Sequence, residues 1–79
     1  MWYFTLRQDD LSSNQYRFLQ QKATLTEVEL FNEPYSNLRL FGVASEQYRA
    51  FVDALDLEGL HYQVMSERPT RKQLLESMR

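Results

Sequence analysis

The sequence predicts a small α+β domain, and three patterns lead to that prediction. Apolar and polar side chains alternate in four short segments, which is typical of strands with one buried face. Between these segments, apolar residues recur at three- and four-residue spacing, as on the buried stripe of an amphipathic helix. Two Ser/Thr-x-x-Gln sequences, at Ser12 and Thr70, mark helix starts. A chain of 79 residues has room for one domain.

The first half of the chain predicts a strand, a helix and a hairpin. The turn Gln8-Asp9-Asp10 separates the first strand from the helix, whose start is the capping box of Ser12 and Gln15. We expect a strand over residues 2–7, a helix from Ser12 to about Lys22, and strands over residues 25–31 and 38–43 that are joined by a polar turn at residues 32–37.

The second half predicts another helix and strand, followed by a helical tail. Ser45 is a good N-cap for a helix that ends near Gly59. Its apolar stripe consists of Tyr48, Phe51, Val52 and Leu55. Residues 60–65 alternate as a fourth strand, and Pro69 opens a short C-terminal helix.

The order of these elements is strand–helix–strand–strand–helix–strand. Because crossover connections in one sheet are right-handed, this order predicts a ferredoxin-like βαββαβ two-layer sandwich. The sheet would be four-stranded and antiparallel, with a short C-terminal helix added. We therefore divide the chain into a ferredoxin-like domain, residues 1–68, and a C-terminal helical tail, residues 69–79.

In such a sandwich the helices cover one face of the sheet and leave the other open. We expect the covered face to carry Trp2, Phe4, Leu40, Tyr62 and Val64. We expect the open face to carry Tyr3, Thr5, Arg7, Arg39, Phe41, Val43, His61, Gln63 and Met65. An exposed patch of this size is unusual on a monomer. The tail helix, through Leu74, Leu75 and Met78, is one possible cover; another protein chain or single-stranded RNA are the others.

The composition favours a cytoplasmic protein without a membrane span. The chain has no cysteine, which excludes disulfides and thiolate metal sites and fits a reducing compartment. No stretch approaches the roughly 18 apolar residues of a membrane helix. The apolar N-terminus lacks the basic start of a signal peptide.

The net charge of −2 is small, but its distribution is uneven. Residues 25–67 carry eight acidic and two basic side chains, whereas residues 68–79 carry four basic and one acidic. One interpretation is a solvated surface with favourable charge at a helix end. The other is a basic tail that meets an acidic partner.

The residues that catalysis or cofactor binding would require are missing from the sequence. His61 is the one histidine, so a zinc site lacks its further ligands, and we expect no metal and no cofactor. Glu27 and Glu29 have the pattern of solvated strand residues. Gly42 and Gly59 are isolated, whereas a phosphate-binding loop needs several glycines. Acylphosphatases share the order of elements, but Arg7-Gln8-Asp9-Asp10 lacks their glycine loop. We expect no enzyme activity.

The leading hypothesis is a small protein-interaction or regulatory module that uses the open face of the sheet. Its partner is another protein or a second copy of the chain, with no membrane involved and nucleic acid disfavoured. Aromatic, Met and Arg side chains are enriched at protein interfaces. The expected contact residues are Tyr3, Arg7, Arg39, Phe41, His61 and Met65 on the sheet, with Arg71 and Lys72 of the tail as secondary candidates.

Two alternatives rest on resemblances to known families. Residues 38–43, Leu-Arg-Leu-Phe-Gly-Val, and the helix after them resemble an RNA-recognition module, in which aromatics on the first and third strands stack bases. Tyr3 and Phe41 are the counterparts here, but Val43 replaces a second aromatic. The nearby Glu27 and Glu29, and a pI near 5.3, oppose phosphate binding.

The order of elements also resembles the ACT type of small-ligand regulatory module, whose sheets pair side by side. That resemblance would place a ligand at the turn after the first strand, where Asp9 or Asp10 could hold an amine. The turn Gln8-Asp9-Asp10 lacks the glycine that such a loop usually contains.

Overall fold

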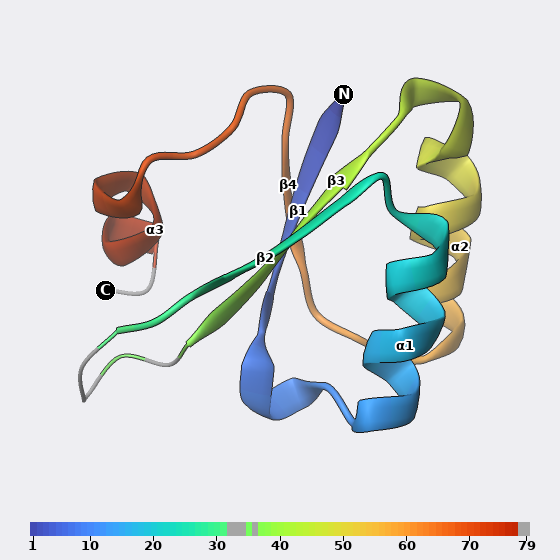
Figure 1. Ribbon diagram of the computed structural model, residues 1–79, viewed down its shortest axis with the longest axis horizontal. Helices are drawn as coiled ribbons and strands as arrows, with labels where there is room; N and C mark the ends of the chain where they lie inside the picture. Colours follow the sequence, from blue (N-terminus) through green and yellow to red (C-terminus); the bar gives the residue numbers. More distant parts are fainter. Residues whose placement is uncertain (32–34, 36, 78–79) are drawn as a thin grey trace.

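The computed structural model describes residues 1–31, 35 and 37–77, and it contains a four-stranded antiparallel sheet and three α-helices (Figure 1). The strands are β1 (Trp2–Arg7), β2 (Leu25–Glu29), β3 (Leu38–Val43) and β4 (Gln63–Met65). The helices are α1 (Ser13–Lys22), α2 (Tyr48–Leu57) and α3 (Arg71–Ser77), and short 3-10 turns form η1 (Gln8–Asp10) and η2 (Ser45–Gln47). The predicted α+β class is confirmed.

The strands lie in the order β2-β3-β1-β4, and each neighbouring pair is antiparallel. Phe4 at the centre of β1 lies opposite Phe41 of β3 and Val64 of β4. Residues directly opposite one another in a sheet share a face. The register therefore fixes which side chains point toward α1 and α2, the two helices that lie together on one side of the sheet (Figure 1).

The main core lies between this helix layer and the sheet. Phe4, Phe41 and Phe51 are fully buried in it, and their rings contact one another in tilted pairs with centroids 4.7 Å and 5.6 Å apart. Tyr48 adds contacts to Phe4 at 5.6 Å and to Trp2 at 5.0 Å. Tilted aromatic pairs stabilise by about 0.5–1.5 kcal/mol each beyond their burial, which suits a core with few residues.

The helix ends follow the sequence signals in most places. Ser12 and Gln15 form the predicted capping box of α1, with both hydrogen bonds present. Gly59 has a φ of 66°, the left-handed conformation that closes α2. The prediction for Ser45 is wrong: it begins η2, and α2 starts three residues later at Tyr48 without a side-chain cap.

One half of the predicted face assignment is correct and the other is not. Trp2, Phe4 and Tyr62 pack in or against the main core as expected. In β3, however, the prediction is wrong. Phe41 and Val43 are fully buried in that core, and Leu40 points to the opposite face of the sheet. The cause is that β3 has apolar residues at both its odd and its even positions, so alternation alone cannot show which face of the strand is toward the helices.

The face of the sheet opposite α1 and α2, called the far face below, is also partly covered. By register it carries Tyr3, Thr5, Arg7, Leu25, Glu27, Glu29, Leu38, Leu40, Gly42, Gln63 and Met65. Leu38 and Leu40 are buried on it, with 4% and 1% of their surface exposed, yet neither belongs to the main core. Figure 1 shows α3 on this side, away from the other two helices. The tail therefore covers part of the face that was expected to be open.

Several boundaries differ from the expectation. The strand expected over residues 25–31 ends at Glu29, and the one expected over residues 60–65 is reduced to three residues. The predicted turn at residues 32–37 falls largely on residues 32–34 and 36, which lie outside the described residues, as does Met78. No helix among the described residues is long and apolar enough to cross a membrane.

Replacing Phe41 with Ala should destabilise the whole domain, because it removes a fully buried ring from the centre of the main core. We expect a loss of about 3–5 kcal/mol in the free energy of unfolding, measured by urea titration. Phe41→Leu keeps most of the volume and should lose less. An unchanged urea midpoint in Phe41→Ala would place this ring outside the core.

Stability at alkaline pH should depend on Tyr62. Burial, then the nearby Asp56 and Tyr48, raise the pKa of its phenol above the ordinary 10.0. The folded state therefore holds this proton more tightly than the unfolded state, and the resulting stabilisation is present below about pH 10 and lost as the pH rises through the folded-state pKa. The fall in unfolding free energy above about pH 10 should be smaller in Tyr62→Phe than in the parent protein. Parallel declines in urea titrations would refute this.

Candidate functional site

The tail of the chain forms a defined structural unit on the far face. We call residues 66–77 the arm: an extended connection, residues 66–70, followed by α3. Thr70 and Gln73 cap the helix, since the Gln73 backbone N–H donates to the Thr70 hydroxyl at 3.2 Å and the Thr70 N–H donates to Gln73 Oε1 at 2.8 Å. This second predicted capping box is confirmed. A helix of seven residues is unstable alone, so its cap and its docking decide whether it forms.

The arm contributes apolar surface to the far face. Pro69 is buried, and Leu74 has 1% of its surface exposed. Neither residue packs in the main core, just as Leu38 and Leu40 do not. These four residues lie on the same side of the sheet, so we infer that they make a second, smaller core between the arm and β3.

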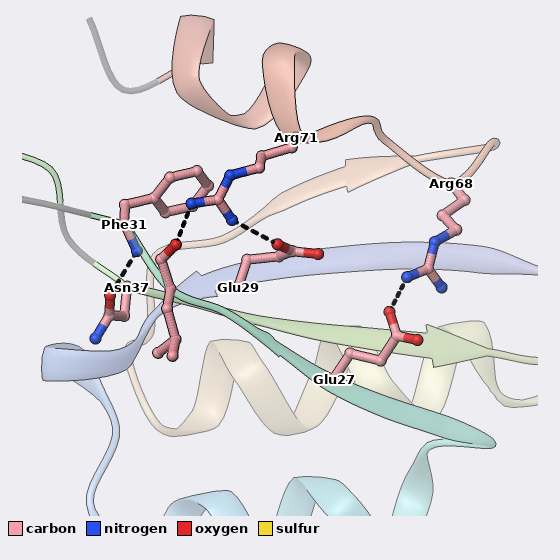
Figure 2. A network of polar contacts seen from close by, with 7 residues as sticks. Glu27, Glu29, Phe31, Asn37, Arg68 and Arg71 are labelled. Atoms are coloured by element: carbon pink, nitrogen blue, oxygen red, sulfur yellow. Dashed lines mark hydrogen bonds and ion pairs between the residues drawn. The ribbon is translucent and has the colours of Figure 1, made fainter.

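Two arginines of the arm meet two glutamates of the edge strand β2 (Figure 2). Arg68 pairs with Glu27, and Arg71 Nη1 lies 3.0 Å from Glu29 Oε2. Glu27 and Glu29 are two positions apart, so they point to the same face of the strand about 7 Å from each other. The basic tail thus meets an acidic partner within its own chain.

Arg71 is the more extensively bound of the two arginines. Besides Glu29, it donates a hydrogen bond to the backbone oxygen of Leu30. Its guanidinium also lies 4.3 Å from the ring centroid of Phe31, a cation–π contact. The backbone N–H of Phe31 donates to Asn37 Oδ1 at 2.9 Å, which fixes the chain beyond β2 (Figure 2). The planar guanidinium suits this combined stacking and fork geometry, which a lysine could not reproduce.

Both ion pairs lie at the surface, so their electrostatic stabilisation is small. The hydrogen bond to Glu27 raises the pKa of the Arg68 guanidinium, which is charged in any case. The side chains of Arg68 and Glu27 are 46% and 32% exposed, and those of Arg71 and Glu29 are 55% and 27% exposed. Water and salt screen such exposed pairs, so they contribute little to stability. We infer that they orient the arm, whereas burial of Leu74 and Pro69 supplies most of its attachment.

One end of the far face stays partly exposed beyond the arm. Met1 is 50% exposed, and Tyr3, Leu25 and Met65 are half-buried around Gly42. A Cβ at Gly42 would lie 2.9 Å from Met1 Sδ and 3.1 Å from Leu25 Cβ, so a larger residue there would displace the Met1 side chain and push Leu25 by a few tenths of an ångström. We call these five residues the exposed end of the far face. Aromatic and Met side chains of this kind are enriched at protein contacts.

The structure brings together only some of the predicted contact residues. Tyr3 and Met65 are register partners on the far face, and Arg71 docks on the same face from the arm. Arg7 ends β1 and is exposed, as are His61, between α2 and β4, and Lys72 on α3.

The two β3 candidates point to the helix side instead. Arg39 stacks on Tyr16 of α1 at 4.3 Å, and Phe41 is enclosed in the main core. Phe41 has no exposed surface to offer a partner, so the expectation that it lies on the open face is wrong.

Sequence reasoning did not assign Glu27, Glu29 or Arg68 to the site, although it named Leu74 of the tail helix as a possible cover of the open face. The signal was present as the contrast between an acidic middle and a basic tail. The two glutamates have the right spacing to share a strand face, but nothing in the sequence shows that the tail returns to that face rather than extending into solvent.

Neither the described acidic, His and Cys side chains nor comparison with known proteins assigns chemistry to this surface. Among residues 1–31, 35 and 37–77, no group of three or more His, Cys, Asp or Glu side chains could hold a metal ion. A scan against protein-family models, a search of curated proteins and a search of solved structures each returned no match.

Replacing Leu74 with Ala should loosen the arm without unfolding the domain. The variant loses buried apolar surface worth roughly 1–3 kcal/mol, and that surface lies outside the main core. Limited trypsin digestion after Arg71 and Lys72 should therefore accelerate about tenfold or more. Leu57→Ala is the matched control, since Leu57 is 88% exposed. Equal digestion rates in both variants would show that Leu74 does not hold the arm.

Proposed function

We propose that this chain is a small, non-enzymatic protein-interaction module of ferredoxin-like topology that self-associates through its far face. The arm of a second copy is the occupant, exchanged for the chain's own arm. The observation that carries the proposal is the docking of Arg68 and Arg71 on Glu27 and Glu29. It identifies a segment whose chemistry fits the face, and an identical copy carries the same segment.

The strand order β2-β3-β1-β4, with all neighbours antiparallel, supports the ferredoxin-like topology. Sequence order also agrees, because α1 connects β1 to β2 and α2 connects β3 to β4. In this arrangement β2 is at one edge of the sheet. A second copy can therefore approach Glu27 and Glu29 without crossing the helix layer.

The arm has the properties of an exchangeable element. Ser66 and Glu67, which join β4 to the anchoring Arg68, are neither helix nor strand, so a change of backbone direction there can redirect the arm without breaking the sheet. The arm's attachment consists of two weak surface ion pairs and a few buried apolar side chains, which makes it the least costly unit to detach. Exchange of an identical element between copies is a low-cost route to dimers.

The exposed end of the far face gives a second reason for association. Met1, Tyr3, Leu25 and Met65 lie next to the arm but are left partly uncovered. A second copy brought onto the far face by its arm would shield them. Monomers rarely expose apolar side chains contiguously without a contact role.

The RNA-binding alternative loses its main residue in this structure. A base-stacking ring must be exposed, and Phe41 is fully buried between the sheet and Phe51. Tyr3 remains on the far face, beside the arginines and glutamates that anchor the arm. The ACT-type alternative concerns a different surface, the turn at η1.

A charge-exchange experiment tests the proposal. In Glu27→Arg/Glu29→Arg, the basic arm meets a basic far face and is repelled. In Arg68→Glu/Arg71→Glu, an acidic arm meets the acidic far face and is also repelled. Each variant alone should be monomeric. Mixed in equal amounts, each arm finds an opposite face on the other variant, so a 1:1 heterodimer should form, measured as a doubling of mass in light scattering or sedimentation.

The quadruple variant, with all four charges reversed, restores the match within one chain and should behave as the parent protein does. Circular dichroism should show that every variant is folded, because the changes lie outside the main core. If the mixture of folded double variants keeps the monomer mass at concentrations up to about millimolar, the arm is an internal strap and the proposed self-association is wrong.

A further inference from the structure

A groove of about 490 Å³ lies on the other side of the sheet from the arm, beside the start of α1. Its wall is formed by η1, the first turns of α1 and Arg39 of β3. Small-molecule sites usually occupy roughly 300–1,000 Å³, so the groove is large enough for a compact ligand. Its lining is mostly polar, and it includes Gln8, Asp9, Ser13, Arg17 and Arg39.

Two arginines give the groove its electrostatic character. Arg39 stacks on the ring of Tyr16 at 4.3 Å, and Tyr16 in turn contacts the core ring of Phe41 at 5.9 Å. This stacking fixes the guanidinium plane and leaves the N–H groups at its edge available. Arg17 lies on the exposed side of α1 and lines the same groove.

Unlike Arg68 and Arg71 of the arm, the two arginines of the groove form no ion pair among the described residues. Within the part of the chain that the structure describes, no carboxylate lies within ion-pair distance of Arg17 or Arg39. Asp9 is the one acidic residue of the lining, so the two guanidinium groups outnumber it. The groove therefore has a net positive charge in a protein whose own net charge is −2.

The donors of the groove are side chains and do not come from the end of α1. The Ser12 hydroxyl accepts from the backbone N–H of Gln15, and Gln15 Oε1 accepts from that of Ser12, so the helix caps itself. Gln8, which also lines the groove, has its Oε1 enclosed without a hydrogen-bond donor among the described residues. Enclosed amide oxygens normally have a donor. Because this oxygen has no accessible surface, a ligand in the groove does not reach it, and the groove offers the two cationic forks of Arg17 and Arg39.

We propose that this groove binds a small oxyanion, a phosphate or carboxylate group on a compact molecule. Arg39 and Arg17 bind the oxyanion, since guanidinium groups recognise both phosphate and carboxylate with paired hydrogen bonds. The site is separate from the far face, so it neither requires nor excludes exchange of the arm.

The test is a titration of the parent protein followed by ¹⁵N–¹H NMR, with inorganic phosphate and malonate as probes and sodium chloride at matched ionic strength as the reference. Resonances of residues 8–20 and Arg39 should shift with phosphate, malonate or both, and not with chloride. A response to phosphate alone identifies a phosphoryl ligand, and a response to malonate alone identifies a carboxylate. Arg39→Gln should weaken binding about tenfold, since it removes a charged hydrogen-bonding group.

Arg49→Gln is the matched control, because Arg49 is an exposed arginine of α2 outside the groove, and it should change the affinity by less than about twofold. Arg39→Lys keeps the charge but loses the fork, so it should bind with intermediate affinity. If Arg39→Gln and Arg49→Gln weaken binding equally, or if neither probe shifts the groove more than chloride does, the groove is not an oxyanion site.

Discussion

The central strand β3 is apolar on both of its faces, and the rest of the structure follows from that constraint. Phe41 and Val43 point toward α1 and α2, while Leu38 and Leu40 point the other way. A strand of this kind must be covered twice, because each buried leucine or phenylalanine side chain is worth roughly 1.5–3 kcal/mol only when water is kept from it. A βαββαβ chain supplies one layer of helices. The arm supplies the second cover.

The two covers differ in kind. On the helix side, three fully buried phenylalanines and their aromatic neighbours make a continuous core that holds the domain together. On the far side, a seven-residue helix attaches through Leu74, Pro69 and two surface ion pairs. Because exposed ion pairs contribute little and the buried area is small, the second cover is much weaker than the first. We therefore expect the fold to survive detachment of the arm, with Leu38 and Leu40 becoming exposed to solvent.

Much of the fold could be predicted from local patterns, because local chemistry decides those features. Capping boxes at Ser12 and Thr70 join residues three apart, and alternation over residues 2–7 is unambiguous because polar and apolar side chains separate cleanly. The orientation of β3 could not be predicted in the same way, since the side chains on both faces of this strand are apolar. The pairing of Phe4 with Phe41 decides it, and that is a long-range contact. The arm's docking is likewise long-range: Arg68 and Glu27 are 41 positions apart in the chain.

The candidate site shows the same division. The sequence predicts its basic, aromatic and Met residues, and Tyr3, Met65 and Arg71 do lie on one face, but the pattern at Glu27 and Glu29 predicts solvated surface. The role of Glu27 and Glu29 becomes apparent only when the tail folds back and its arginines pair with them. Because the basic arm and the acidic residues Glu27 and Glu29 belong to one chain, the arm has a high effective concentration at these glutamates, which is why weak contacts suffice. The same weakness is the basis of the proposed exchange, in which an identical arm from a second chain would form identical contacts and would also bring new surface to the partly exposed Tyr3 and Met65. The balance between the two arrangements would then depend on protein concentration and on what the exposed end of the far face gains, and not on the strength of the ion pairs, which is equal in both.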